Sequence, residues 1–268
     1  MSGISTTLEF FSKDHLIIDV LSKYSKCWFS ANTKWTNLTL DLNVMWQSCG
    51  IVQFEQNALD LYSKGSSVPT VFETSIDVGD NGVEFLELLP YINIFSQCNF
   101  SHITMLSIHL TFSPNTAPTA ISRLRDVIAH FVHVLPEVQA LATSMEVISE
   151  LTRFPRDAGN PTPFPKLKAL TLYDMFLIRE YDETGEHDDP GREAAELFFR
   201  QRQEDGCPIQ VLDLTPCKCS TLPDMSYLEN VEGMKVEWLD RGGNWQEARC
   251  GSGRVAQGLG WNFSVRKM

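Results

Sequence analysis

The chain has 268 residues, of which 43% are hydrophobic and 21% are charged, as in an ordinary folded protein. Its formal net charge is -12, and no basic patch is evident, so binding to the phosphate backbone of a nucleic acid is not expected. No apolar run reaches the roughly 20 residues that a membrane-spanning helix needs. These properties predict an acidic globular protein with no nucleic-acid or membrane partner.

The start of the chain lacks a basic stretch followed by an apolar run, the pattern of a secretory signal. The seven cysteines are scattered between Cys27 and Cys250, and their number is odd. Without a secretory signal, such cysteines are expected to be reduced thiols. We therefore expect a cytoplasmic or nuclear location.

A short apolar pattern recurs along the chain: a large apolar residue, two variable residues, Leu or Met, one variable residue and a mostly apolar position. Its six copies begin at Trp35, Ile103, Val138, Leu167, Ile209 and Val231. This pattern is typical of the strand part of a leucine-rich repeat. The spacing from Leu38 to Leu106 is about twice that from Leu106 to Leu141, so we expect a degenerate copy within residues 68–78.

Segments between these copies carry apolar residues at helical spacing. The expected helices are residues 54–64, 83–95, 120–134 and 193–203. Two stretches rich in turn-forming or acidic residues, 154–165 and 181–192, are expected to be long loops. Crossover connections through helices favour parallel strands. The predicted fold class is therefore α/β: an irregular leucine-rich-repeat-like solenoid of parallel strands alternating with helices, preceded by a short helical N-terminal segment.

In such an array one face of the strands packs under helices and the other is open. For the copies that begin at Leu167 and Ile209, the expected open positions are Lys168, Thr171, Tyr173, Gln210, Asp213 and Thr215. A row of polar and aromatic side chains there suits a protein partner. For any single residue, a solvated face with no partner is an equally good interpretation.

The segments at both ends of the array resemble those of a known family. Residues 20–31, followed by 34–38, resemble the end of an F-box, where a helix leads through a turn into the first repeat strand. Residues 164–172, 206–214 and 231–238 resemble the closing repeats of fungal, mushroom-type F-box proteins. The resemblance covers roughly residues 20–238. The Leu-Pro dipeptide that usually opens an F-box is absent before Leu16, so this F-box is truncated or degenerate.

The resemblance implies the substrate-recognition subunit of a Skp–cullin–F-box ubiquitin ligase, whose F-box binds the adaptor subunit and whose repeats bind the protein substrate. The positions that match the adaptor-binding helix end are Val20, Leu21, Cys27, Trp28 and Trp35. Each of them equally suits a core. The alternative is a stand-alone leucine-rich-repeat scaffold that binds a protein partner without ligase function.

The expected division has three parts: a partial F-box-like helical segment at 1–35, the solenoid at 36–240, and a C-terminal cap or tail at 241–268. No motif in these parts indicates catalysis. Cys217 and Cys219, with Cys207, lack the second ligand pair of a zinc site. His130 and His133 lack a His-Glu-x-x-His motif. We therefore expect no metal, no cofactor and no enzymatic activity.

Overall fold

In the computed structural model the described residues are 4–10, 22–23, 26–27, 37–44, 72–78, 100–101, 103–112, 129, 132, 135–154, 162–173, 190–217 and 225–255. The chain divides into two compact units, one of residues 1–141 and 156–166, the other of residues 142–155 and 167–268. The helices expected at 54–64 and 83–95 lie outside the described residues. Of the helix expected at 120–134, residues 129 and 132 are described, and both are helical.

The first unit contains two pairs of parallel strands. Strand β1 (Ile4–Phe10) pairs with β3 (Phe72–Val78), and β2 (Asn37–Val44) pairs with β4 (Met105–Phe112). Residues 4–10 belong to the expected helical N-terminal segment, and there the prediction is wrong, because they form a strand.

Strand β3 also corrects the expected order of the array. Residues 72–78 are extended, as the alternating sequence predicts. They pair with β1, however, while β2 and β4 pair directly with each other. The expected degenerate copy between β2 and β4 is therefore wrong. Alternation identifies a strand, but it carries no information about which strand will be its partner.

The second unit is built on a sheet whose strand order is β5-β6-β7-β8-β9. The strands are β5 (Ala140–Thr143, beginning at the boundary of the unit), β6 (Ala169–Leu172), β7 (Val211–Asp213), β8 (Lys235–Leu239) and β9 (Trp245–Arg249). Strands β6, β7 and β8 run parallel, and β9 is antiparallel to β8. The N–H of Tyr173 donates to the carbonyl of Thr143 at 3.0 Å, which joins the ends of β6 and β5. The expectation of an α/β fold with mostly parallel strands is confirmed.

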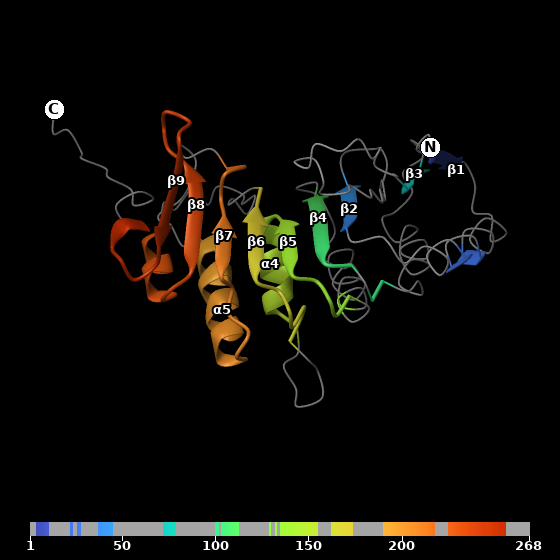
Figure 1. Cartoon of the computed structure of the whole chain (residues 1–268). Helices are drawn as coiled ribbons and strands as arrows, with labels where there is room; N and C mark the ends of the chain where they lie inside the picture. The colour runs from blue at the N-terminus through green and yellow to red at the C-terminus, as the bar shows by residue number, and fades with distance from the viewer. Residues whose placement is uncertain are drawn as a thin grey trace, which may run out of the picture. The chain divides into compact units, whose positions relative to one another are not determined.

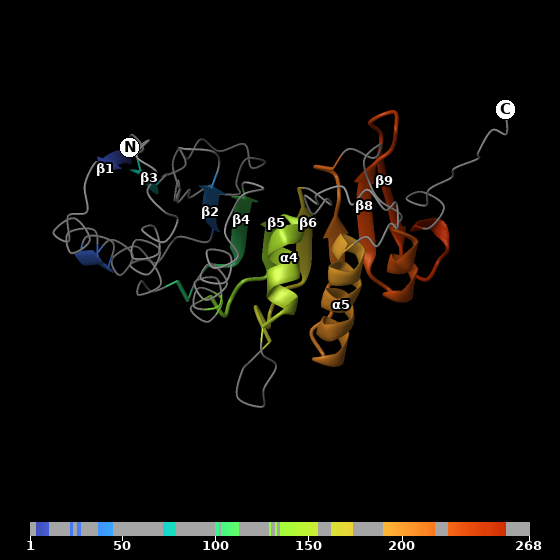
Figure 2. The same cartoon turned by 180° about the vertical axis from the view of Figure 1, so that it is seen from behind.

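Helices α4 (Met145–Thr152) and α5 (Pro190–Glu204) lie side by side on one face of this sheet, as the front and back views show (Figures 1 and 2). Helix α5 confirms the helix expected at 193–203. It begins within the expected 181–192 loop, because proline is well suited to the first turn of a helix. Helix α4 was not expected. A 3-10 helix, η4 (Ser226–Asn230), precedes β8. None of the helices in the described ranges is both long and apolar enough to cross a bilayer.

The core of the second unit lies between the sheet and its helices. The central residues of the repeat pattern, Leu170 and Leu212, are 0–1% exposed, and Val236 is fully buried beside them. From the helical layer, Ile148 of α4 and Phe198 of α5 are buried as well. The repeat pattern is thus the inward-facing half of the strands, and burial of these side chains is the main force that holds sheet and helices together.

The residues expected to form a C-terminal cap or tail continue the sheet as far as they are described. A turn at 240–244 leads into β9, which pairs with β8 along its whole length, from Leu239 opposite Trp245 to Lys235 opposite Arg249. Gly243 has a φ of 78°, a left-handed conformation that glycine adopts without strain. Residues 256–268, including Trp261, lie outside the described residues.

Candidate functional site

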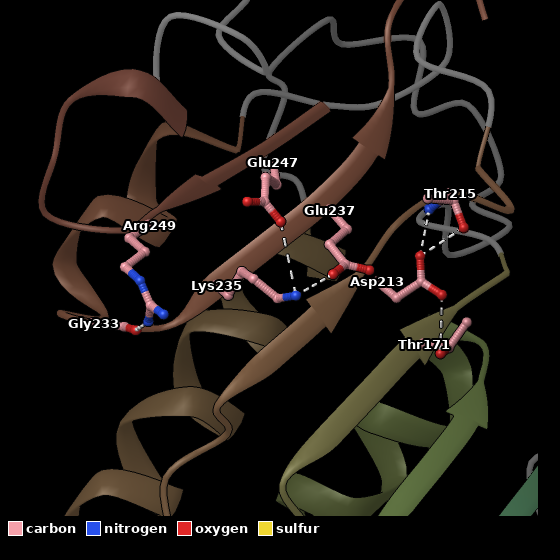
Figure 3. A network of polar contacts seen from close by, with 8 residues as sticks. All are labelled: Thr171, Asp213, Thr215, Gly233, Lys235, Glu237, Glu247 and Arg249. Atoms are coloured by element: carbon pink, nitrogen blue, oxygen red, sulfur yellow. Dashed lines mark hydrogen bonds and ion pairs between the residues drawn. The ribbon is translucent and has the colours of Figure 1, made fainter. Parts of the chain in front are cut away.

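The face of the second unit's sheet that points away from the helices carries most of the charged and hydroxyl side chains of its strands. Along β6 to β9 the buried residues alternate with half-buried or exposed ones, as the period of two in a strand requires. We call this surface the polar face; its charged and hydroxyl side chains are Thr171, Asp213, Lys235, Glu237, Glu247 and Arg249, which Figure 3 shows. The alternation explains why a buried Leu-x-Leu pattern places polar side chains on the opposite surface.

Asp213 is the best-anchored residue of the polar face. The hydroxyl of Thr171, its neighbour in register on β6, donates to Asp213 Oδ2 at 3.3 Å. Thr215 donates twice to Asp213 Oδ1, from its backbone N–H at 2.9 Å and from its hydroxyl at 2.6 Å (Figure 3). These three hydrogen bonds fix the direction of the carboxylate on the half-buried surface.

Lys235 is the centre of a charged group on β8 and β9. Its ammonium is ion-paired with Glu237 on the same strand, and it lies 3.8 Å from Oε2 of Glu247 on β9 (Figure 3). The hydrogen bond to Glu237 raises the pKa of Lys235 above its ordinary value, so the side chain is positively charged at neutral pH. Arg249 donates to the carbonyl of Gly233 at 3.2 Å. The two carboxylates and two cations of β8 and β9 balance, and Asp213 on β7 makes the polar face as a whole slightly acidic.

Among the described residues of the second unit, two large aromatic side chains are exposed. Tyr173, directly after β6, is 38% exposed, and Trp245, the first residue of β9, is 53% exposed. Tyrosine and tryptophan are enriched in protein interfaces because they bury a large apolar area and also carry a hydrogen-bonding group. A surface with fixed polar groups and exposed aromatic side chains is suited to contact with another macromolecule.

The structure brings three of the six expected open-face residues into direct contact, namely Thr171, Asp213 and Thr215. Tyr173 is exposed at the end of β6. Lys168 and Gln210 are exposed but come just before β6 and β7 begin, joined by a hydrogen bond of 2.8 Å from the Gln210 N–H to the Lys168 carbonyl. Each of them precedes a buried leucine by two residues, and residues two apart in a strand point to the same face. The alternation therefore places Lys168 and Gln210 on the side of the buried leucines, not on the polar face.

Sequence reasoning missed the charged side chains of β8 and β9. In residues 235–239 the charged Lys235 and Glu237 alternate with the apolar Val236 and Trp238. This alternation indicates that Lys235 and Glu237 lie on the outer face of a strand. Strand β9 has little such signal. Its sequence is Trp-Gln-Glu-Ala-Arg, in which Ala248 is the one buried side chain.

Of the five positions matched to an adaptor-binding helix end, Cys27 is described, and it is exposed in a helical segment. Val20, Leu21, Trp28 and Trp35 lie outside the described residues. His130, His133 and Cys219 do as well.

Two of the described cysteines in the second unit, Cys217 and Cys250, are buried. Burial raises the pKa of Cys250 to about 12, so its thiol is neutral at physiological pH, and the thiolate is the reactive form. The buried Cys217 thiol donates to the carbonyl of Leu172 at 3.1 Å. Within the described part of the chain, no three His, Cys, Asp or Glu side chains are grouped as metal ligands would be.

The chain matches no protein-family model, no curated protein and no solved structure with which it was compared. Its function has to be inferred from its own residues and their geometry.

Asp240, in the turn between β8 and β9, is expected to make the stability of the fold depend on pH. Its Oδ1 accepts hydrogen bonds from the N–H groups of Gly242 at 2.8 Å and Asn244 at 2.9 Å, and its Oδ2 accepts one from Gln246 at 3.1 Å. The backbone hydrogen bond from Asn244 is the largest cause that lowers the pKa of Asp240. A carboxyl group whose pKa is lower in the folded protein than in the unfolded chain stabilises the fold at pH values above its pKa in the unfolded chain. This stabilisation is lost as the pH falls through the pKa of the folded state.

We therefore expect D240A to unfold at a lower urea concentration than wild type at neutral pH. The difference between the two should shrink as the pH falls from about 6 to about 2, because protonation removes the advantage of the wild-type carboxylate. The measurement is a series of urea unfolding curves followed by circular dichroism. E193A, which removes an exposed carboxylate from α5, is the matched control. A difference that stays constant with pH would contradict this role of Asp240.

Proposed function

We propose that this protein is an interaction module that binds a partner protein through the polar face of β6 to β9. The row formed by Thr171, Asp213 and Glu237, which are neighbours in register on three parallel strands, is the observation that carries the proposal. Side chains held by hydrogen bonds before binding lose less conformational entropy when a partner arrives. The exposed Tyr173, directly after β6, adds an aromatic anchor of the kind that dominates binding energy in interfaces.

The finer architecture that we propose is an irregular leucine-rich-repeat-like solenoid. Two features of the second unit support it. Strands and helical segments alternate along the chain, in the order β5, α4, β6, α5, β7, η4 and β8. The central Leu or Met of the copies in this unit is also buried: Leu170, Leu212 and Met234 are each at most 1% exposed. Stacked units of this kind expose their strands as a binding surface.

We further propose that the partner is a substrate for ubiquitination, with the N-terminal segment holding the adaptor subunit of a Skp–cullin–F-box ligase. Support comes from the resemblance of residues 20–38 to the end of an F-box. The exposed Cys27 is compatible with a contact there. The alternative, a stand-alone leucine-rich-repeat scaffold, needs the polar face alone.

One affinity purification tests both the binding of a partner through the polar face and the proposed role in a ubiquitin ligase. The tagged full chain is expressed in its native source, and co-purifying proteins are quantified by mass spectrometry. We expect Y173A and D213N each to reduce recovery of the partner about tenfold, the size of effect typical of an interface anchor. D213N keeps the shape of the side chain while removing its charge. E193A, exposed on α5 on the opposite face of the sheet, should leave recovery unchanged.

The same experiment separates the ligase from the scaffold. Recovery of the adaptor with the wild type, and its loss in W28A together with W35A while the partner is kept, supports the ligase role. A partner recovered without the adaptor supports the stand-alone scaffold. Circular dichroism checks that each variant is folded. Partner recovery that is indifferent to Y173A and D213N would contradict binding through the polar face.

A further inference from the structure

Within the described residues, no strand pairs with the outer edge of β9. Strand β9 is last in the strand order of its sheet, and among the described strands its one partner is β8. Its register with β8 is continuous over five residue pairs, without a bulge, and its sequence contains no proline. Bulges and prolines are among the devices by which proteins prevent a further strand from adding to an edge.

The direction of the backbone groups of β9 follows from the hydrogen bonds at its two ends. The N–H of Asp240 donates to the carbonyl of Asn244, and the N–H of Cys250 donates to the carbonyl of Met234, both at 2.9 Å. In an antiparallel pair, residues alternate between facing the partner strand and facing away. The backbone N–H and carbonyl groups of Asn244 and Cys250 are directed toward β8. The backbone groups of the odd-numbered residues between them are therefore directed away from β8.

These outward residues are Trp245, Glu247 and Arg249. Within the described ranges, no residue forms a hydrogen bond with the outward N–H or carbonyl of Trp245 or Glu247. The Arg249 carbonyl accepts hydrogen bonds from the N–H of Ser252 at 3.3 Å and from its hydroxyl at 2.5 Å, so at this residue the outward group that the edge offers is the N–H. The edge therefore offers donors and acceptors spaced for another antiparallel strand.

We propose that this edge pairs with the same edge of a second copy of the chain, in an antiparallel dimer whose two-fold axis passes through Ala248. This register places Glu247 of each copy opposite Arg249 of the other. Two opposite-charge pairs then lie across the new strand boundary, and the Arg249 N–H of each copy donates to the Glu247 carbonyl of the other. The small side chain of Ala248 lies at the axis, where two strands in a non-hydrogen-bonded pair approach most closely.

Charge disfavours the two neighbouring symmetric registers, in which the two-fold axis passes through Glu247 or through Arg249 and places like charges opposite each other. A two-fold axis through Glu247 would place the two Glu247 carboxylates directly opposite each other, which destabilises a strand pair. The side chain of Glu247 is 50% exposed and lies 3.8 Å from Lys235, a distance at which it remains available to a second cation. Arg249 is exposed as well. The isologous pairing of one surface with itself is the commonest geometry of dimers.

A strand-edge contact is small, so we expect a weak dimer whose population rises with protein concentration. Sedimentation of the purified full chain over about 1 to 300 micromolar measures the dissociation constant. E247R and R249E each turn both opposite-charge pairs into like-charge pairs. Each should raise the dissociation constant about tenfold.

The double variant E247R/R249E decides the register, because it restores both pairs with the charges exchanged. We expect its dissociation constant to return to within about threefold of the wild type. R241E makes a charge change of the same size in the turn outside β9, and it should leave the constant unchanged. Circular dichroism and urea unfolding verify that all variants are folded.

A chain that remains monomeric over the whole concentration range would overturn the proposal. So would a dimer that neither single variant weakens, or a double variant that fails to restore association. The inference does not depend on the proposed partner protein, since it concerns β9 and purified protein alone.

Discussion

Replacing Arg202 by methionine is expected to lower the free energy of unfolding by about 3 kcal/mol, although the two side chains are similar in length. Arg202 lies on α5 and is 2% exposed, which is rare for a charged side chain. Its Nε donates to the carbonyl of Cys207 at 3.0 Å, and its Nη2 donates to the carbonyl of Leu167 at 3.0 Å. The guanidinium also lies over the Phe198 ring, 5.9 Å from its centre.

These contacts tie three segments together: α5, the loop that follows it, and the residues that lead into β6. Methionine fills much of the same volume but donates no hydrogen bond, so two backbone carbonyls lose a donor in an environment with little water. Burial lowers the pKa of Arg202 from its ordinary value, while the negative charge of Asp205 acts in the opposite direction. The guanidinium remains protonated at neutral pH, because arginine starts from so high a value.

Urea unfolding followed by circular dichroism measures the effect. R202K retains the charge but has no planar fork to reach both carbonyls, so we expect it to recover less than half of the loss. R200M, at an exposed position on the same helix, is the matched control and should change the unfolding free energy by less than about 0.5 kcal/mol. An R202M protein as stable as wild type would show that the two hydrogen bonds do not stabilise the fold.

L212A is expected to cost about 3 kcal/mol of unfolding free energy. Leu212 lies in the middle of β7 and is fully buried. In register it is flanked by Leu170 on β6 and Val236 on β8, both of which are also buried. Truncation to alanine leaves a cavity between three strands and the helices above them, which the surrounding side chains can fill only in part.

V211A provides the comparison for L212A. Val211 is the preceding residue on β7 and points to the polar face, where it is half-buried. Its truncation should cost about 1 kcal/mol or less, since it leaves no enclosed cavity. Equal losses for the two variants in urea unfolding would contradict the assignment of β7's inner and outer faces.

The local structure of the second unit could largely be read from the sequence. The copies of the repeat pattern that begin at residues 138, 167, 209 and 231 each overlap or directly precede a strand. Helix α4 could have been found too, because Val147, Ile148 and Leu151 share one helical face and Glu146 favours the first turn. Its length of eight residues makes the periodic signal weak.

The candidate site could be predicted only where a strand has a clear alternation of apolar and polar residues. Thr171 and Asp213 could be placed on one face because each lies next to a buried leucine in a strand. Glu247 could not, because its position on that face depends on β9 pairing with β8, and β9 has little apolar alternation of its own. Once the turn at Asp240 reverses the chain, the register of β9 follows from the hydrogen bonds of that turn.

Local spacing in the sequence is enough to indicate which strand residues are buried. Leucines at alternate positions remove apolar surface from water wherever a strand forms, so the strands and their buried faces follow from local spacing. Which strands are neighbours follows from the packing of the whole fold: β2 pairs with β4, β3 with β1, and β9 with β8. Strand pairing relies on backbone groups that are the same in every residue, and parallel partners lie far apart in the chain. The polar face and the free edge of β9 arise from those pairings.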